Sequence, residues 1–264
     1  MKYIASCHGT FFLVLSAIVK ASFRRFFFLG SLLTLAFVPL RGAVLINEYA
    51  LRGNLNDNLG GTPLTSLGGQ ITSLGYVFAA NQGLSLSIPF LSFANFSIEL
   101  SFKFDAVTGY RKIADFKSLV EDMGFYVLNG SLNFFPVATA TQTDFTPGTN
   151  VVVALTRDGA TGIVTGYVNG QQRFSFLDNT TLAVATPGVP SNLILFKDDT
   201  ATGGNEASGG QLNYLRVFNG ALTSGQVSAL YAGGAPQAVP EPTTLLLLML
   251  GGPVVFALAR RRSV

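Results

Sequence analysis

Alternating apolar and polar positions dominate the middle of the chain. From Phe96 to Asp105 every second residue, beginning with Phe96 and ending with Phe104, is apolar, and the residues between them are polar. Such alternation predicts an antiparallel strand with one face on a core and the other in water. Residues 83–89 alternate in the same way, and further short runs rich in β-branched and aromatic residues follow at close spacing, as in a sandwich or jelly roll.

The residues between these runs are typical of tight hairpins. Asn129-Gly130 and Asn169-Gly170 each separate two strand-like runs, and Asn-Gly favours the positive φ angles of a type I′ turn. One helix is predicted in residues 222–234, where Thr223 and Gln226 have the spacing of a capping box. The pattern therefore predicts an all-β fold, a two-sheet antiparallel β-sandwich with one short C-terminal helix.

The first 43 residues follow a different pattern. Basic residues precede an apolar run from Phe26 to Leu40 and the small pair Gly42-Ala43, which is the order of regions in a secretory signal. We therefore interpret residues 1–43 as an export signal peptide. The pair Arg24-Arg25 leaves a twin-arginine signal open as an alternative to ordinary export.

The other end of the chain joins an apolar segment to a basic cluster. Residues 243–259 carry no charge and are just long enough to cross a bilayer, which predicts a transmembrane helix. Arg260, Arg261 and Arg262 follow directly, and such residues stay on the cytoplasmic side, which places the rest of the chain outside. An ordinary C-terminal membrane anchor would show the same two features.

A third feature at this end resembles a known signal. Pro240, Glu241 and Pro242 precede the apolar segment and the arginine cluster, and this order closely resembles the PEP-CTERM sorting signal of Gram-negative bacteria. The resemblance implies that residues 235–264 are a linker and a sorting signal, cleaved near the Pro-Glu-Pro motif by an exosortase. It also implies a chain anchored first in the inner membrane and then sorted to the cell envelope, the outer surface or the extracellular matrix.

Setting the two ends aside changes the chemistry that remains. Cys7 and His8 are the only cysteine and histidine, and both lie in the export signal, so the exported body has no thiol or imidazole for nucleophilic catalysis, zinc binding or a disulfide. Five of the 17 Lys and Arg residues lie in the signal and three at 260–262, which leaves nine against the 14 Asp and Glu between Glu48 and Glu241. The body is therefore acidic, and nothing in its charge supports nucleic-acid binding.

The body, residues 44–234, resembles the laminin-G-like domains of the concanavalin A-like lectin/glucanase group. The resemblance rests on the opening segment 49–57, the strands at 83–89 and 96–104, the hairpin at 151–172, and the closing strand and helix at 212–234. It implies a concanavalin A-like jelly roll of two curved antiparallel sheets. Asn213 stands where members of the family usually carry an acidic residue, which puts any site built on that carboxylate in doubt.

An acidic, glycine-rich loop at 196–210 is the best candidate for a metal site. Calcium takes six to eight oxygen ligands, and the loop offers them on Asp198, Asp199, Asn205 and Glu206. The resemblance adds support, because laminin-G-like domains often hold calcium at the rim of the sandwich. The alternative is a solvated acidic loop whose aspartates stabilise turns.

Catalysis is not expected. Glycoside hydrolysis requires two carboxylates on either side of the scissile bond, and retaining glucanases of this group supply them from one strand as Glu-x-Asp-x-x-Glu. The sequence has no such pattern, and Glu121 and Asp122 are adjacent, so on a strand they would point to opposite faces.

The expected function is therefore binding or adhesion in the cell envelope or exopolysaccharide matrix, with a polysaccharide or a surface protein as partner. Tyr110 and Tyr126 are the tyrosines nearest to predicted loops, and core packing is the alternative role for Tyr126. Two other functions stay open: a structural matrix protein with no defined ligand, and a glycoside-processing enzyme with an unrecognised site.

Overall fold

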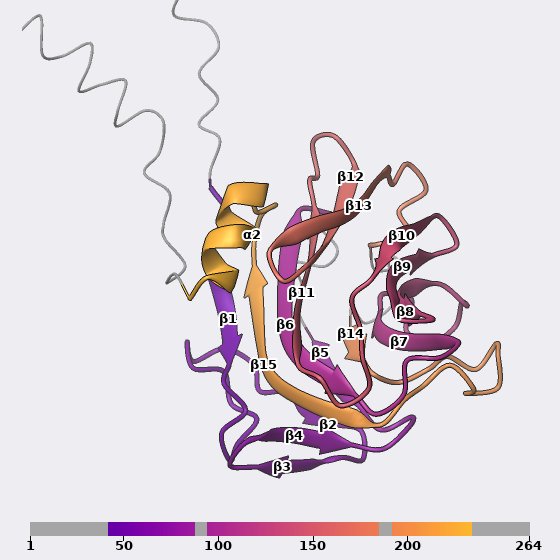
Figure 1. Cartoon of the computed structure of the whole chain (residues 1–264). Coiled ribbons are helices and arrows are strands. Elements are labelled where there is room, and N and C mark those ends of the chain that lie inside the picture. Colours follow the sequence, from indigo (N-terminus) through magenta and orange to yellow (C-terminus); the bar gives the residue numbers. More distant parts are fainter. Residues whose placement is uncertain (1–41, 88–93, 185–191, 234–264) are drawn as a thin grey trace, which may run out of the picture. The chain divides into compact units, whose positions relative to one another are not determined.

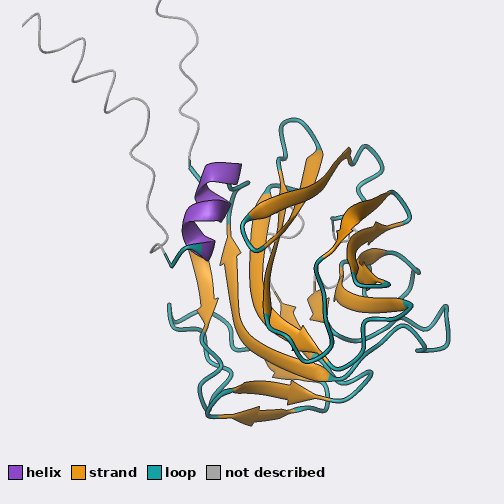
Figure 2. Cartoon of the chain, viewed as in Figure 1, coloured by secondary structure: helices purple, strands orange, loops and turns teal. Residues whose placement is uncertain are grey.

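The computed structural model describes residues 42–87, 94–184 and 192–233, and nearly all of their regular structure is strand (Figure 2). The predicted transmembrane helix 243–259, the motif at 240–242, the arginines at 260–262 and all but the last two residues of the export signal lie outside the described residues. Within the described ranges, no helix is both long and apolar enough to cross a bilayer.

The larger sheet in the described part of the chain contains eight antiparallel strands (Figure 1). In spatial order seven of them are β13 (Gln171–Leu177), β12 (Ile163–Val168), β11 (Val151–Arg157), β6 (Phe96–Phe104), β15 (Gly210–Phe218), β4 (Gly75–Phe78) and β3 (Gln70–Thr72). The eighth, β1 (Leu45–Tyr49), also pairs with β15.

The smaller sheet contains seven antiparallel strands among the described residues. They are, in spatial order, β10 (Ala138–Thr143), β9 (Ser131–Phe135), β8 (Gly124–Leu128), β7 (Tyr110–Asp115), β14 (Asn192–Leu195), β5 (Leu84–Ser87) and β2 (Thr65–Ser66). Arg173 of β13 makes a two-pronged ion pair of 2.6 and 2.8 Å with Asp144, just after β10, and so links an edge of each sheet. The two sheets confirm the predicted antiparallel sandwich.

Aromatic rings from both sheets fill the core between them. Phe102 and Phe104 of β6 lie 5.4 and 5.7 Å from Phe196, which follows β14. Phe78 of β4 stacks on the same Phe196 ring at 4.4 Å. All four are buried, so the inward positions of the alternating pattern supply most of the apolar burial that stabilises the sandwich.

The other face of β6 departs from the prediction at Ser97 and Glu99, because these two side chains are covered rather than exposed to water. Ser97 and Glu99 are 0% and 1% exposed. The segment leading into helix α2 (Ser224–Tyr231) crosses this face: Ser97 Oγ donates to Gly220 O at 2.8 Å and accepts from Leu222 N at 2.9 Å. The polar residue Ser97 on the outer face of β6 is therefore hydrogen-bonded to the protein rather than in contact with water.

The predicted hairpin turns are confirmed. Both residues of Asn129-Gly130 have positive φ angles, 48° and 82°, and those of Asn169-Gly170 are 50° and 77°. Positive φ at both central positions is the requirement of a type I′ turn, and it joins β8 to β9 and β12 to β13.

Helix α2 begins as the sequence predicts. The hydroxyl of Thr223 accepts from Gln226 N, and the side chain of Gln226 accepts from Thr223 N, which completes the capping box. Val227 and Leu230 are buried in a small cluster with outward residues of the larger sheet. Tyr231, at the end of the helix, is 48% exposed.

Candidate functional site

A row of polar and aromatic side chains crosses the outer face of the smaller sheet. The strand register places Thr139 beside Asn133, Asn133 beside Tyr126, and Tyr126 beside Lys112 on four adjacent strands. Glu206 continues the row, because Lys112 N donates to its carbonyl oxygen at 2.7 Å. The row thus brings together side chains from β10 to β7 and from the acidic loop that follows β14.

Three aromatic rings lie on this face. The Tyr110 ring is 5.5 Å from both the Tyr126 and the Phe135 rings, in edge-to-face geometry. Tyr126 has no exposed surface, whereas Tyr110 and Phe135 are half-buried. Tyr126 is therefore a packing residue, but it packs beneath the other two rings on the outer face and is not part of the main core. Sequence reasoning missed Phe135, although its alternation with Asn133 places both on one face.

Beneath this surface lies a buried ion cluster centred on Lys112. Its Nζ is 2.7 Å from Asp199 Oδ2, 3.7 Å from Asp115 Oδ2 and 3.9 Å from Asp198 Oδ1, and all four side chains are fully buried. The ammonium also donates to Met123 O at 3.3 Å and lies 4.5 Å from the centre of the Tyr126 ring. Carboxylates and a ring face together stabilise a cation that has lost its water.

The acidic loop is held by hydrogen bonds from its own residues. Asp198 Oδ2 accepts from Glu206 N at 2.8 Å and from Thr202 Oγ1 at 3.0 Å, and Asp199 Oδ1 accepts from Ala201 N at 2.9 Å. Side-chain oxygens that accept from nearby backbone N–H groups are typical of turns. Asn205 is exposed, and its Nδ2 donates to Thr202 O.

These contacts bear on the predicted calcium ligands. The carboxylates of Asp198 and Asp199 face the Lys112 ammonium, and the Asn205 amide is used within the loop. In the described part of the chain, no group of three or more Asp, Glu, His or Cys side chains has an arrangement that could hold a metal ion. Asp198 and Asp199 therefore pair with an ammonium in this arrangement, and calcium binding at the loop stays a prediction.

The electrostatics of the site depend on its many carboxylates. Burial, together with the negative charges of Asp122 and Asp198, raises the pKa of Glu206 to about 7. Burial would also raise the pKa of Asp199, but the hydrogen bond and charge of Lys112 lower it below its ordinary value. Burial and the charge of Asp122, which accepts from Tyr126 Oη at 3.2 Å, raise the pKa of Tyr126 far above its usual range.

Hydrogen-bond acceptors without donors also gather here. Among the described residues, five buried side-chain polar atoms have no hydrogen-bond partner. Three are acceptor atoms on this face or directly below it: Asn133 Oδ1, and Asp115 Oδ2 and Asp198 Oδ1, which lie 3.7 and 3.9 Å from the Lys112 ammonium. A fourth is the donor Arg111 Nε, next to Lys112 in β7. Asn133 is 3% exposed, and its Nδ2 donates to two oxygens of β10, so its Oδ1 is turned away from that strand. Buried polar atoms are rarely left without partners, so each marks a place where a hydrogen-bond partner can add stability.

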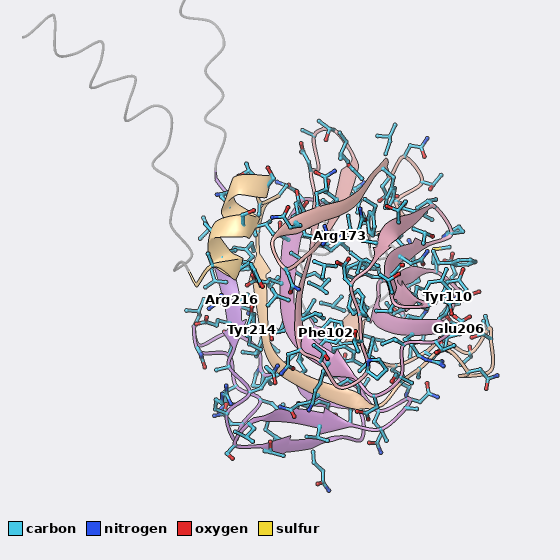
Figure 3. All side chains as sticks on the ribbon, viewed as in Figure 1. Phe102, Tyr110, Arg173, Glu206, Tyr214 and Arg216 are labelled. Atoms are coloured by element: carbon cyan, nitrogen blue, oxygen red, sulfur yellow. The ribbon has the colours of Figure 1, made fainter. Side chains whose placement is uncertain are left out.

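The other glutamates of the body, Glu48, Glu99 and Glu121, lie outside the candidate site. Glu99 lies on the outer face of the larger sheet, where Arg216 Nη1 donates to it at 3.3 Å and Arg216 Nε donates to Glu48 at 3.0 Å. Burial raises the pKa of Glu99, although Arg216 opposes the shift. Glu121 is exposed in the loop between β7 and β8. Figure 3 shows Arg216 with Tyr214 at one sheet and Glu206 with Tyr110 at the other.

Three solved structures show the same fold at low sequence identity. Domain 4 of AbnA, a GH43 extracellular arabinanase from Geobacillus stearothermophilus solved with arabinotriose, is 20% identical with a TM-score of 0.51, over 72% of this chain and 99% of that domain. Trypanosoma rangeli sialidase is 14% identical with a TM-score of 0.55, over 74% of this chain and 33% of the sialidase. The binding domain of botulinum neurotoxin serotype D is 14% identical with a TM-score of 0.51, over 72% and 51%.

Structural similarity at these sequence identities shows the fold and nothing more. A comparison with curated protein sequences found no match to this chain. Family profiles are more specific. Residues 238–263 match the PEP-CTERM protein-sorting motif, which implies an exported protein of a Gram-negative bacterium and processing by an exosortase. Residues 78–228 match the concanavalin A-like lectin/glucanases superfamily, and the chain belongs to that superfamily.

Proposed function

We propose that this chain is an exported binding module of the cell envelope or exopolysaccharide matrix, and that it engages glycan through the outer face of its smaller sheet without catalysis. The half-buried pair Tyr110 and Phe135 is the observation that carries the proposal. Aromatic rings offer apolar surface with low conformational entropy, and acceptor groups beside them can fix the orientation of sugar hydroxyls.

The superfamily match and the sorting-signal match also support this proposal. Members of a lectin/glucanase superfamily and neighbours such as an arabinanase domain solved with arabinotriose make glycan the first ligand class to test. The PEP-CTERM match supports exposure of the module to envelope or matrix polysaccharides after export. A fold alone does not assign function, so the residues of the site must decide.

The test is binding of the purified full-length protein to a panel of soluble neutral and charged polysaccharides, measured by affinity electrophoresis and calorimetry. Tyr110→Ala and Phe135→Ala should each weaken binding by about tenfold, which corresponds to about 1.4 kcal/mol. Tyr231→Ala is the matched control, because Tyr231 is an exposed ring on helix α2. An equal loss of glycan affinity in all three variants would contradict the proposal that glycan binds to the outer face of the smaller sheet.

The absence of catalysis is part of the proposal. Glu99 is buried in a strand of the larger sheet, whereas Glu121 is exposed in a loop of the smaller sheet, so we do not expect them to act as a catalytic pair. Asp122 and Glu206 are the acidic residues that share the candidate face, and Glu206 has a pKa of about 7. Release of reducing sugar from any bound glycan, abolished by Glu206→Gln, would show a glycoside-processing enzyme instead.

A structural matrix protein with no defined ligand is the alternative outcome of the same experiment. In that case no polysaccharide of the panel would bind in a saturable way that a soluble competitor reverses. A surface-protein partner would be shown by saturable binding to a purified envelope protein that Tyr110→Ala weakens while glycans fail.

A further inference from the structure

The carboxylates of the candidate site form an inner and an outer layer. The inner layer, Asp115, Asp198 and Asp199, is fully buried around the single ammonium of Lys112. The outer layer, Asp122 and Glu206, is part-exposed. Three carboxyl groups surround the single ammonium of the inner layer, so this ammonium has no charge to spare for the outer layer.

The outer layer has no cation of its own. Among the described residues, neither Asp122 nor Glu206 forms an ion pair with a lysine or arginine. The nearby Arg111 donates through Nη1 to the carbonyl oxygens of Tyr110 and Asn205. The carboxylates that face solvent next to Tyr110 are therefore available to a positively charged group from outside.

The hydrogen-bond inventory points in the same direction. Asn133 Oδ1, buried beside Tyr126, has no hydrogen-bond donor. Asp115 Oδ2 and Asp198 Oδ1 also lack a hydrogen bond, but they lie 3.7 and 3.9 Å from the Lys112 ammonium inside the cluster. A face with an unpaired amide oxygen and two carboxylates outside any ion pair is complementary to a ligand that brings donors and positive charge. The inner layer already shows this chemistry, because the Lys112 ammonium lies among carboxylates and 4.5 Å from the Tyr126 ring centre.

We propose that the glycan bound at this face carries free primary amines, and that Asp122 and Glu206 pair with one of its ammonium groups beside the Tyr110 ring. This inference rests on the glycan-binding function proposed above and names its ligand class: a polysaccharide with de-N-acetylated amino sugars. The sugar ring packs against Tyr110 and Phe135, and the ammonium completes an outer layer that repeats the arrangement around Lys112. Figure 3 shows Tyr110 and Glu206 at the same edge of the sandwich.

The experiment compares two hexamers of equal length, one of glucosamine with free amines and one of N-acetylglucosamine, by calorimetry with the full-length protein. The amine hexamer should bind at least tenfold more tightly, and rising salt should reduce that preference, because part-exposed ion pairs are screened. Glu206→Gln and Asp122→Asn should each reduce the preference several-fold. Glu48→Gln, which removes a part-exposed carboxylate on the other sheet, should leave it unchanged.

Other outcomes overturn the inference in distinguishable ways. Equal or tighter binding of the N-acetylated hexamer would show a neutral ligand and leave the glycan-binding function standing. Failure of both hexamers and of every neutral glycan would overturn both. A lysine hexamer that binds as tightly as the amine glycan, with no effect of Tyr110→Ala, would show a charge site for peptides. Competition by millimolar calcium that disappears in Glu206→Gln would show a metal site.

Discussion

Lys112 Nζ lies 2.7 Å from Asp199 Oδ2, and neither side chain is exposed to solvent. The two residues are 87 positions apart in the sequence, so their contact joins β7 to the acidic loop that follows β14. The backbone reinforces this connection, since Lys112 N donates to Glu206 O. The loop that carries the predicted ligands is thus fixed to the sheet by an internal cation.

Replacing Lys112 with methionine should strongly destabilise the protein, because it leaves three buried carboxylates without a counter-charge. Breaking a buried pair typically costs about 3–5 kcal/mol, which lowers the thermal unfolding midpoint of a domain of this size by about 10 °C. Lys103→Met is the control, since Lys103 lies part-exposed on the larger sheet. The double variant Lys112→Met/Asp199→Asn should recover part of the loss. A midpoint equal to that of Lys103→Met would contradict the role of Lys112.

Calcium binding is tested by the same measurement in millimolar calcium and in excess EDTA. Since Asp198 and Asp199 already pair with the Lys112 ammonium, the unaltered protein should unfold at the same temperature in both. Lys112→Ala keeps the surrounding oxygens and removes the ammonium, so calcium should raise its midpoint by a few degrees. A calcium-dependent rise in the unaltered protein, abolished in Asp198→Ala/Asp199→Ala, would instead confirm the sequence-based calcium prediction.

The outer carboxylates predict a pH dependence of stability. Because the folded pKa of Glu206, about 7, lies above its ordinary 4.5, the folded state holds this proton more tightly than the unfolded state. The stabilisation is present below about pH 4.5 and is lost as pH rises through about 7. Glu206→Gln has no carboxylate there, so above pH 7 its midpoint should exceed that of the unaltered protein by a few degrees.

Glu48→Gln is the matched control. If the unfolding midpoints of Glu206→Gln and the unaltered protein differ by the same amount at every pH in this range, Glu206 is not the source of the pH dependence. Asp122, Asp198 and Asp199 face Glu206 with like charge, and Lys112 partly offsets them. Asp122→Asn should therefore weaken the same pH dependence, because it removes one of the charges that raise the pKa of Glu206.

Sequence patterns located the fold correctly where the determining contacts are local. The alternation of β6, the two Asn-Gly turns and the Thr223 capping box depend on residues within a few positions of one another, and the structure confirms each. The burial of Ser97 on the outer face of β6 could not be predicted from local sequence patterns. Ser97 is buried by Gly220 and Leu222, more than 120 positions away, and such distant contacts leave no local period.

The candidate site shows the same limit. The acidic loop stands out in the sequence, but its counter-ion, Lys112, lies 87 positions away in a strand. Phe135 likewise meets Tyr110 only because β8 lies between β7 and β9. Three of the six residues in Tyr110–Asp115 are charged, so the local pattern gives no sign that Lys112 is buried.

The larger sheet provides a final prediction, based on Glu99 and Arg216. Glu99 is 1% exposed, its Oε1 has no hydrogen-bond partner, and burial raises its pKa. Glu99→Gln removes the buried charge and keeps an acceptor for Arg216, so the midpoint should be unchanged or slightly higher. Arg216→Met leaves Glu99 buried without a counter-charge and should cost about 3 kcal/mol, seen as a midpoint about 6–12 °C lower.

The double variant Glu99→Gln/Arg216→Met separates charge from packing. If the buried charge causes the loss, removing it together with Arg216 should restore most of the midpoint, as in a double-mutant cycle with strong coupling. Arg216 Cζ also lies 5.0 Å from the centre of the Tyr214 ring, and Arg216 Nε donates to Glu48. If the double variant does not recover, the loss in Arg216→Met comes from these contacts and not from the buried charge of Glu99. Glycan binding at Tyr110 should be unaffected in all three variants, because the two faces belong to different sheets.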